Sequence, residues 1–512
     1  MKDVSSRKIR VGWAEADITP DEPVLLAGQF HARVSTGVLD KITSTVLAME
    51  SMIDDKSSDY AIMVSCDLLW ISNELRMKVL GFLKLEMPEL SADKIFFNAT
   101  HTHSAPETNC SLDAYFSGVD IGIDLNELGV MHPKDYVSFA AKRIAKAISQ
   151  AWQFRAEAGI GYGMGFAVVG RNRRVVYYDG KSVMYGKTND SNFSHIEGYE
   201  DHSLYVMCTY DLSKQLTGIL VNVTCPSQVN AGRCQISSDF WHYVRMKLRN
   251  KYGESLYIFA QCGAAGDISP YILYSNVAEA RMLSLKGYQE ESSDDPSGAY
   301  TLNRQLGLCN EIADRIVQSI NSIMPLVVKD INFAPYFKHT RRKVELSKNS
   351  ITESHLKLVN EEIAIARNKY EEERKQLAKN GKNNPYWYFG ITARYRIMRW
   401  LEGVIERFEK LKNLDKLQFE INVLRIGDIV IAASPFELFV DYGIQIKARS
   451  PAVQTFIVQL SDDSTTSGYL PTQRAVMGGG YSAVAASNIV GPEGGRELVE
   501  QTLKVINELW NE

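Results

Sequence analysis

The sequence predicts a large α/β domain, and three observations support this. Hydrophobic residues make up 45% and charged residues 23% of the 512 residues, which is the composition of an ordinary globular protein. Short apolar runs rich in Ile, Val, Phe and Tyr alternate with amphipathic stretches, the pattern of a sheet covered by helices. Neither an internal repeat nor a Pro-rich linker divides the chain, so we expect a single domain over residues 1–512.

Four apolar runs that end at small or polar residues are predicted to be buried strands. They cover residues 61–70, 94–100, 218–225 and 255–262. Helices are predicted at 135–152 and 238–253. The second helix opens with Ser238 and Asp239 and closes on Gly253, which are residue types that start and end helices.

Residues 351–412 differ in character from the rest of the chain. Two charged amphipathic stretches are separated there by GKNNP at 381–385, which predicts two antiparallel helices inserted into the domain. The following segment, 417–435, returns to strand patterns with Gly427 and Asp428 at a hairpin turn.

Charge and cysteine usage narrow the classes of function. The formal net charge is −4 and the 57 basic residues are scattered, so we expect no nucleic-acid partner. The seven cysteines are odd in number and never form a close-set pair, which predicts reduced and mostly buried thiols.

The N-terminal segment is basic but lacks the apolar stretch of a secretory signal peptide. No run reaches the roughly 18 apolar residues of a membrane span. We therefore expect a cytoplasmic protein without stable membrane insertion.

The segment NATHTHSAPE at 98–107 is the first candidate for chemistry. His101 and His103 directly follow a predicted strand, and alternation along an extended chain puts both imidazoles on one side. Neutral imidazole is a good zinc ligand, and loops that leave strand ends carry the chemistry of α/β proteins. Two ordinary hydrogen-bonded histidines would have the same spacing.

The segment FAQCGAAGDISPY at 259–271 is the second candidate. A strand there enters a glycine- and alanine-rich turn that lets the backbone approach another group, and then presents Asp267 and Ser269. Ser269 would need a base or a metal beside it to act chemically. A tight turn capped by Asp and Ser is the alternative interpretation.

These segments and three others resemble the neutral ceramidase family, in the same order and over nearly the whole chain. The five are VGWAEADITP at 11–20, NATHTHSAPE, AGDISP at 265–270, ASPFEL at 433–438 and SGYLPT at 467–472. The resemblance implies a large mixed-sheet catalytic domain of the neutral ceramidase type, carrying the helical hairpin. Because the chain ends soon after SGYLPT, we expect no C-terminal immunoglobulin-like domain.

The resemblance also implies site residues. The family holds a zinc ion with two histidines, a glutamate and a tyrosine, and His101, Glu437 and Tyr469 match three of these ligands. His103 matches a histidine that contacts substrate, and Ser269 matches the active-site serine. His103 or Tyr469 would stabilise the oxyanion.

The fourth ligand position of the family is changed in this chain. The family has a histidine before a proline where NVTCPSQV places Cys225, and a thiolate is itself a strong zinc ligand. His242, in SSDFWHYVR, could supply the missing nitrogen instead. A third possibility is that Cys225 is a buried apolar residue and the metal site is altered.

RNRR at 171–174 matches the region where the family has an Asn-Arg pair near the site. Arg171, Asn172 and Arg173 are therefore candidate substrate-binding residues, together with His242 and Asp267. An arginine there would bind a carboxylate, a phosphate or a polyhydroxylated group. A surface charge cluster is the alternative.

Together these features predict a zinc-dependent hydrolase that cleaves an amide bond with metal-activated water. An ester hydrolase, a glycan-processing enzyme and a noncatalytic binding protein that has lost a metal ligand are the alternatives. The partner would be a small-molecule or glycan substrate, and we expect ceramide to be a poor one.

Overall fold

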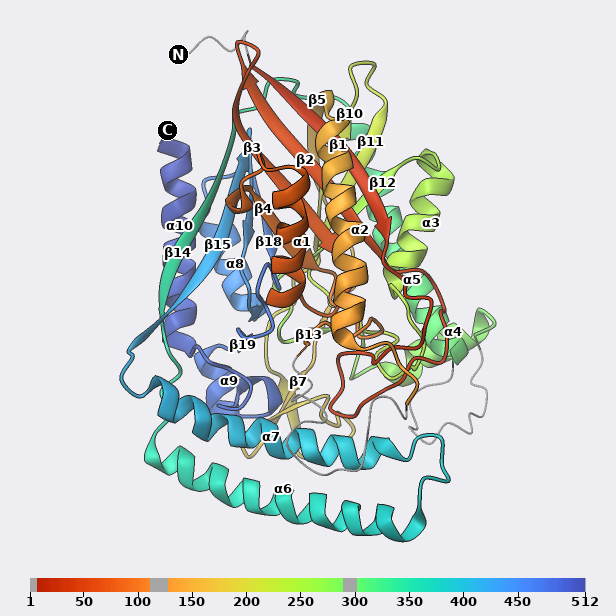
Figure 1. Cartoon of the computed structure of the whole chain (residues 1–512), viewed down its shortest axis with the longest axis vertical. Coiled ribbons are helices and arrows are strands. Elements are labelled where there is room, and N and C mark those ends of the chain that lie inside the picture. Colours follow the sequence, from red (N-terminus) through yellow and green to blue (C-terminus); the bar gives the residue numbers. More distant parts are fainter. Residues whose placement is uncertain (1–6, 111–127, 289–301, 512) are drawn as a thin grey trace.

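Two β-sheets packed face to face, with helices on both outer faces, make up the molecule (Figure 1). The computed structural model describes residues 7–110, 128–288 and 302–511. From edge to edge, the larger sheet consists of β12 (Tyr257–Cys262), β11 (Leu216–Val223), β10 (Ser203–Tyr210), β5 (Ala156–Phe166), β1 (Arg7–Asp17), β2 (Thr43–Ile53), β3 (Lys56–Cys66) and β4 (Ile95–Ala99). The smaller sheet consists of β14 (Phe337–Ser347), β15 (Lys416–Ile426), β16 (Ile429–Ala433) and β18 (Gln454–Val458).

Both sheets are mixed, which agrees with the mixed-sheet domain that the resemblance implies. The outer pairs β3–β4 and β11–β12 are parallel, whereas the pairs between them are antiparallel. In the smaller sheet only β16–β18 is parallel. A parallel pair needs a crossover connection, and the chain forms these crossovers with helices. Loops that leave the carboxyl ends of these strands carry the candidate site residues.

Alternation along the strands fills two separate cores. In β2, Val46 and Ala48 pack towards the helices, whereas Leu47 and Met49 pack against the second sheet. All four side chains are fully buried. The central layer between the sheets is therefore as apolar as the two outer layers, and both faces of β2 exclude water.

Within the part of the chain that the structure describes, four helices cover the larger sheet and two cover the smaller one. On the larger sheet these are α1 (Asn73–Glu86), α2 (Pro133–Gln153), α3 (Phe240–Tyr252) and α5 (Leu302–Val327). On the smaller sheet they are α8 (Val440–Arg449) and α10 (Pro492–Asn511). The remaining helices are α4 (Asn276–Leu285), α6 (Glu353–Asn380), α7 (Tyr388–Leu411) and α9 (Gln473–Gly478), with 3₁₀ turns η2 (Ala92–Lys94) and η4 (Tyr481–Ala483).

The helix termini follow their local sequence. The side chain of Asp239 accepts a hydrogen bond from the backbone N–H of Phe240 at the start of α3, and Gly253 ends that helix with a φ of 118°. Thr352 and His355 form a reciprocal capping box at the start of α6. The caps at Asp239 and Gly253 account for the close agreement between the predicted range 238–253 and α3.

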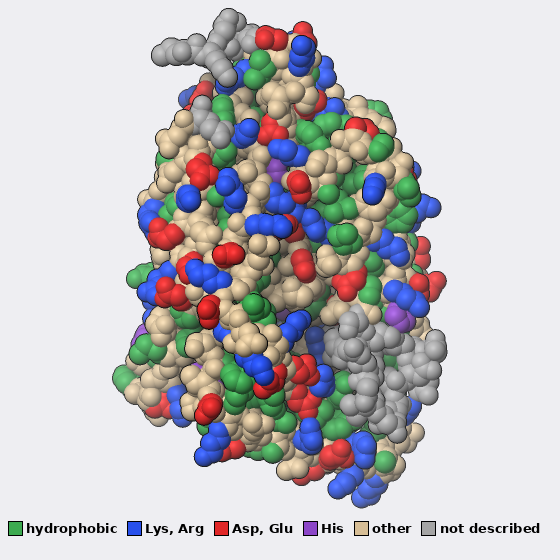
Figure 2. Space-filling view, turned by 60° about the vertical axis from the view of Figure 1, so that its left-hand side comes forward, with side chains coloured by type: hydrophobic (Ala, Val, Ile, Leu, Met, Phe, Trp, Pro, Cys, Tyr) green, Lys and Arg blue, Asp and Glu red, His purple; other side chains and the backbone are tan. Residues whose placement is uncertain are grey.

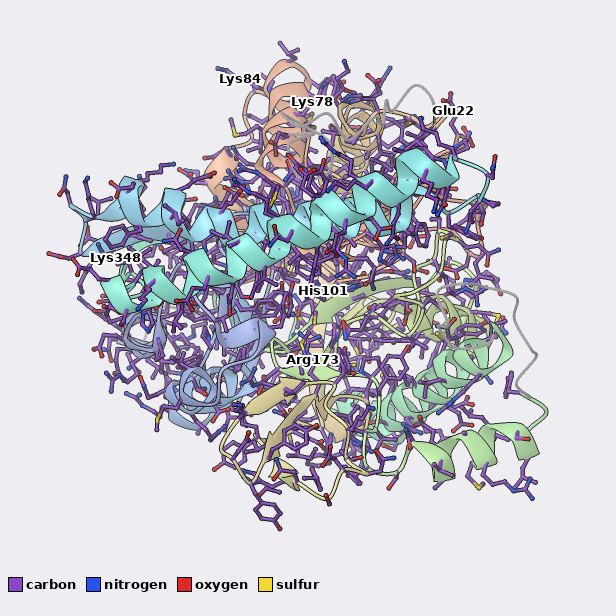
Figure 3. All side chains as sticks on the ribbon, turned by 90° about the horizontal axis from the view of Figure 1, so that it is seen from below. Glu22, Lys78, Lys84, His101, Arg173 and Lys348 are labelled. Atoms are coloured by element: carbon purple, nitrogen blue, oxygen red, sulfur yellow. The ribbon has the colours of Figure 1, made fainter. Side chains whose placement is uncertain are left out.

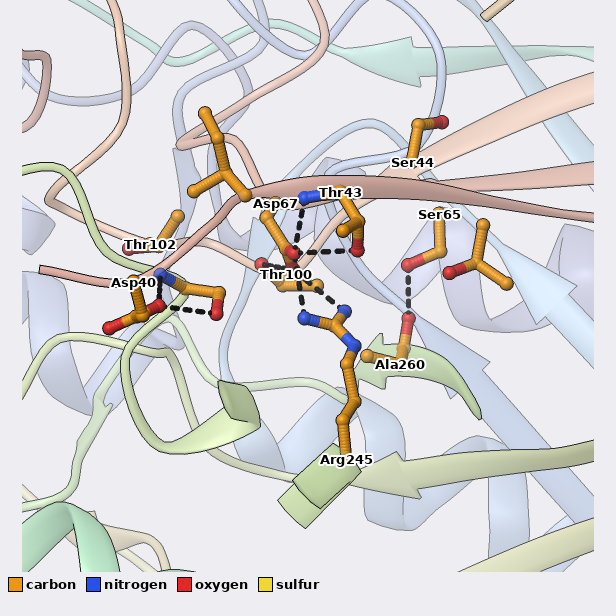
Figure 4. Close-up of polar contacts among 12 residues, drawn as sticks. Asp40, Thr43, Ser44, Ser65, Asp67, Thr100, Thr102, Arg245 and Ala260 are labelled. Carbon is orange, nitrogen blue, oxygen red and sulfur yellow. Dashed lines mark hydrogen bonds and ion pairs between the residues drawn. The ribbon is translucent and has the colours of Figure 1, made fainter. Parts of the chain in front are cut away.

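The two edges of the larger sheet meet each other. The Asn98 side chain in β4 donates a hydrogen bond to the backbone carbonyl of Ala260 in β12 at 3.1 Å. Ser65 in β3 donates to the same carbonyl at 2.6 Å (Figure 4). The sheet is thus curled, and the loops that follow β4 and β12 lie at one end of the molecule.

A buried ion pair fixes the loops at that end. The Arg245 guanidinium of α3 binds both carboxylate oxygens of Asp67, at 2.7 and 2.9 Å (Figure 4). Asp67 also accepts hydrogen bonds from the backbone N–H of Thr43 at 2.9 Å and from the hydroxyl of Thr100 at 3.2 Å. Since Asp67 turns the chain towards these partners, β3 ends at Cys66 and not at residue 70 as predicted.

The helices α6 and α7 lie side by side across the end of the molecule that carries these loops (Figure 1). They fall within the predicted range 351–412. Their contact has a hydrophobic core of its own, which includes Ile363, Tyr370 and Tyr395. On the face that Figure 2 shows, charged side chains of both signs are interspersed. Among the described residues, no helix is long and apolar enough to span a membrane.

Arg245→Met tests the role of the buried pair. The substitution leaves the Asp67 carboxylate buried and unpaired, so the free energy of unfolding should fall by about 3–5 kcal/mol. Arg342→Met is the matched control, because Arg342 pairs with Glu508 on the surface and its removal should change this value by less than about 1 kcal/mol. Equal effects of the two substitutions in urea unfolding would contradict this account.

Candidate functional site

A cavity of about 820 Å³ opens at the end of the molecule where the strand-end loops meet. His101, His103, Arg173, Glu437 and Tyr469 all line it. Seen from below, His101 and Arg173 lie close together in the middle of the molecule, and the α6–α7 hairpin crosses in front (Figure 3). The cavity therefore collects candidates from four distant parts of the sequence.

The loop after β4 holds the two histidines in a constrained conformation. His101 has a φ of 60°, which is rare for a residue with a Cβ atom and is found disproportionately at functional sites. The flanking threonines fix this backbone, since Thr100 is bound by Asp67 and the Thr102 hydroxyl donates to the backbone carbonyl of Ser237 at 2.8 Å.

Backbone carbonyls orient both imidazole rings. Nδ1 of His101 lies 2.8 Å from the carbonyl oxygen of Leu69, and Nδ1 of His103 lies 3.0 Å from that of Gly28. A carbonyl only accepts, so each Nδ1 carries the proton. Gly28 allows this approach, because its φ is 97° and a Cβ atom there would meet Nδ1 of His103 at 2.6 Å.

The two Nε2 atoms consequently face each other, at a distance of 3.3 Å. Burial lowers the pKa of both histidines, that of His103 well below its ordinary value, so both rings favour the neutral form. Two neutral rings with protonated Nδ1 atoms direct lone pairs at one another. A cation between or beside them would relieve this repulsion.

Glu437 and Tyr469 reach the same place through a short parallel pairing. Strand β17 (Glu437–Leu438) pairs with β19 (Tyr469–Leu470), and the two residues are direct partners. The Glu437 carboxylate lies 3.5 Å from Nε2 of His101 and accepts a hydrogen bond from the Tyr469 hydroxyl. Burial, followed by this carboxylate, raises the pKa of Tyr469 well above its ordinary value, while the neighbouring Arg173 opposes the shift.

The glycine-rich turn after β12 supports Glu437. A Cβ atom on Gly266 would meet the backbone oxygen of Glu437 at 2.4 Å, so this glycine permits the close approach. Asp267 accepts hydrogen bonds from the backbone N–H of Val440 at 2.9 Å and from the Asn172 side chain at 2.8 Å. Burial raises the pKa of Asp267 to about 7. Asn172 and Asp267 thus support the loops around the site through hydrogen bonds and do not line the cavity.

Arg173 is the member of RNRR that enters the cavity. Its guanidinium donates to the carbonyl of Gly266 at 2.9 Å and to the Tyr469 hydroxyl at 3.4 Å. Arg171 lies instead 3.6 Å from Glu200 and lines a different hollow. The fourth residue, Arg174, is fully buried in a two-bond ion pair with Glu197.

Cys225, His242 and Ser269 are not brought to the cavity. The Cys225 side chain belongs to the hydrophobic core beneath α3 and α5, and burial raises the pKa of its thiol well above the ordinary value. His242 is half-buried on α3, with its ring against Tyr243. Ser269 is fully buried in β13 (Ile268–Ser269), which pairs with β6 (Arg171–Asn172), and its hydroxyl accepts from the backbone N–H of Tyr271. The structure therefore does not support Cys225 or His242 as a metal ligand, or Ser269 as a group that contacts substrate.

The donor set fits a zinc ion in its chemistry. Within the described ranges, no three His, Cys, Asp or Glu side chains are close enough together to hold a metal. His101 and Glu437 supply two such ligands, and the Tyr469 oxygen would be the third protein ligand. Three protein ligands with one open position are typical of catalytic zinc, and backbone carbonyls on Nδ1 atoms are the usual outer support.

Several cavity residues carry no recognisable sequence pattern. Phe30 and Tyr481 pack edge to face at 5.6 Å, and Tyr481 contacts the Tyr469 ring at the same separation. Trp400 of α7 packs behind Phe30 and Tyr481, and Arg396 of the same helix lines the cavity. Only a pattern spanning several hundred residues would have revealed them.

Comparison with known proteins supports the fold assignment. No protein-family model and no curated protein matches the sequence. The neutral ceramidase from Pseudomonas aeruginosa superposes with a TM-score of 0.62 at 15% identity, covering 98% of this chain and 75% of that chain. A ceramidase complexed with C2 gives a TM-score of 0.63 with the same identity and coverage. The chain therefore has the neutral ceramidase fold, and the predicted fold class is confirmed.

Zinc content tests the assignment of ligands. After zinc loading and desalting, elemental analysis should find about one zinc per chain, as in a single catalytic site. His101→Ala should lose most of this zinc, whereas Cys225→Ala should retain it because the sulfur lies in the hydrophobic core. Zinc loss in a folded Cys225→Ala protein would contradict the site described above.

Proposed function

We propose that this protein is a metal-dependent hydrolase of amide bonds. The observation that carries the proposal is the pair of neutral imidazoles whose Nε2 atoms face each other at 3.3 Å beside the Glu437 carboxylate. Such an arrangement is unfavourable alone, and a cation bound to Nε2 of His101 and to Glu437 would relieve it while leaving the lone pair of His103 able to accept a proton. The neutral ceramidase fold adds support, since the solved structures with this fold are described as ceramidases.

In this proposal His101, Glu437 and Tyr469 hold a zinc ion. The ion would lower the pKa of a water molecule from 15.7 towards roughly 7 and polarise the carbonyl to be cleaved. Arg173, 3.4 Å from the Tyr469 oxygen, favours the charged phenolate that a metal ligand must provide.

His103 is the group suited to proton transfer. Its Nδ1 is anchored to Gly28, so the unprotonated Nε2 faces the cavity and can accept a proton from the attacking water. The same atom can then pass this proton to the departing nitrogen.

Water, and not a serine, is the nucleophile in this proposal. Ser269 is fully buried and already accepts a hydrogen bond from the backbone of Tyr271. Serine requires an adjacent base to become a nucleophile, and none of its described contacts supplies one. Amides and esters would both react with water activated in this way, so the natural substrate must be defined by the rest of the cavity.

His103→Ala tests the proton-transfer role. With zinc content unchanged, kcat on an N-acyl substrate should fall by roughly 10²- to 10⁴-fold, which is the usual contribution of a general acid–base residue. His242→Ala is the matched control and should retain activity, because His242 lies outside the cavity. The substrate panel contains N-acyl amino acids, N-acetylated sugars, simple esters and a short-chain fluorescent ceramide. Failure of the zinc-loaded protein to cleave any member would contradict the proposed hydrolase.

A further inference from the structure

We infer that the substrate carries a carboxylate next to the bond that is cleaved, and that Arg173 and Tyr185 bind this carboxylate. The inference rests on the proposed amide hydrolase, whose substrate class it names. An N-acylated amino acid is the simplest compound with an amide and a carboxylate in this relation.

Arg173 is a buried cation that forms no ion pair with a carboxylate of the described residues. Its side chain is 3% exposed, and no carboxylate of the described residues lies within 4.0 Å of its guanidinium. One of its hydrogen bonds, to the carbonyl of Gly266, has a normal length of 2.9 Å. The bonds to Tyr185, Gln228 and Tyr469 are 3.4–3.5 Å long, and Nε has no partner. A buried charge in this state is costly, and an anionic ligand would remove that cost.

Tyr185 adds a donor beside Arg173. Its hydroxyl oxygen accepts hydrogen bonds from Gln228 at 2.5 Å and from Arg173 at 3.4 Å, which leaves the hydroxyl proton for a ligand. Tyr185 has a φ of 56°, and its backbone N–H donates to the carbonyl of Arg173 at 2.8 Å. The strained backbone thus holds the phenol against the guanidinium, and Tyr185 lines the cavity.

The charge of the cavity wall agrees with an anionic ligand. The described lining residues include the cations Arg173, Lys187 and Arg396, whereas Glu437 is their one carboxylate. The protein as a whole has a net charge of −4, so the positive charge of the cavity wall is opposite in sign to the net charge of the chain. An anionic substrate would be attracted to such a wall.

The position of Arg173 limits where the carboxylate can sit. Its Nη2 atom lies 3.4 Å from the Tyr469 hydroxyl, which in turn contacts Glu437. A group bound to the guanidinium is therefore a neighbour of the reacting centre, within a few bonds of the amide. The flat fork of an arginine matches the two oxygens of a carboxylate.

The test uses a ligand that cannot be cleaved. In 4-oxopentanoate a methylene replaces the amide N–H of N-acetylglycine, and 4-oxopentanamide is the same compound without the charge. Calorimetry on the zinc-loaded full chain should show the carboxylate binding about 10- to 100-fold more tightly, as expected for charge-assisted hydrogen bonds. Arg173→Gln should abolish this preference, and Tyr185→Phe should reduce it. Arg171→Gln, the same change at a residue that lines a different hollow, should leave it intact.

The outcomes separate this inference from the proposed function. Equal binding of the two compounds, or inorganic phosphate binding more tightly than 4-oxopentanoate, would overturn the carboxylate subsite. Cleavage of N-acetylglycine and N-acetylglycinamide at equal rates would also overturn it, while supporting the hydrolase. A retained carboxylate preference without cleavage of any amide would support the subsite and contradict the hydrolase. Tyr185→Phe keeps the test decisive should Arg173→Gln fail to fold.

Discussion

One buried carboxylate organises the end of the molecule that carries the candidate site. Asp67 is fully buried, so it must be balanced by a cation and by hydrogen-bond donors, and it takes these from β2, from the loop after β4 and from α3. Because Thr100 is one of these donors, the position of His101 depends on the same carboxylate. The backbone at His101 and the packing of α3 therefore both depend on one electrostatic requirement, and neither can shift without exposing or unpairing that charge.

Many elements of this fold could be predicted from the sequence, because the signals for them are local. A buried strand and a capped helix each depend on residues within about ten positions, so β4, β11, β12 and α3 lie close to their predicted ranges. The end of β3 is the instructive exception. An apolar run continues to residue 70, yet a long-range ion pair stops the strand at Cys66.

The site residues also differ in whether short motifs or only long-range contacts identify them. His101, Glu437 and Tyr469 stand in short motifs, and all three line the cavity. Cys225 occupies a motif position as well, but it follows the end of β11 by two residues and its side chain lies with that of Val223 in the core beneath α3. The role of Tyr185 was not foreseeable, because it depends on a positive φ and on contacts with Arg173 that no local pattern encodes.

The hairpin of α6 and α7 has its own apolar core, yet it contributes Arg396 and the ring of Trp400 to the surroundings of the site. Residues in the contact between α6 and α7 can change with little effect on the two-sheet body, whereas the start of α7 is fixed to that body by the packing of Tyr388 on Leu25 and Ala32. The hairpin thus contributes part of the cavity surroundings from outside the loops that hold the candidate site residues. Substitutions at Arg396 and Trp400 would therefore alter the surroundings of the cavity, while the loops that carry His101, Glu437 and Tyr469 keep their own supports.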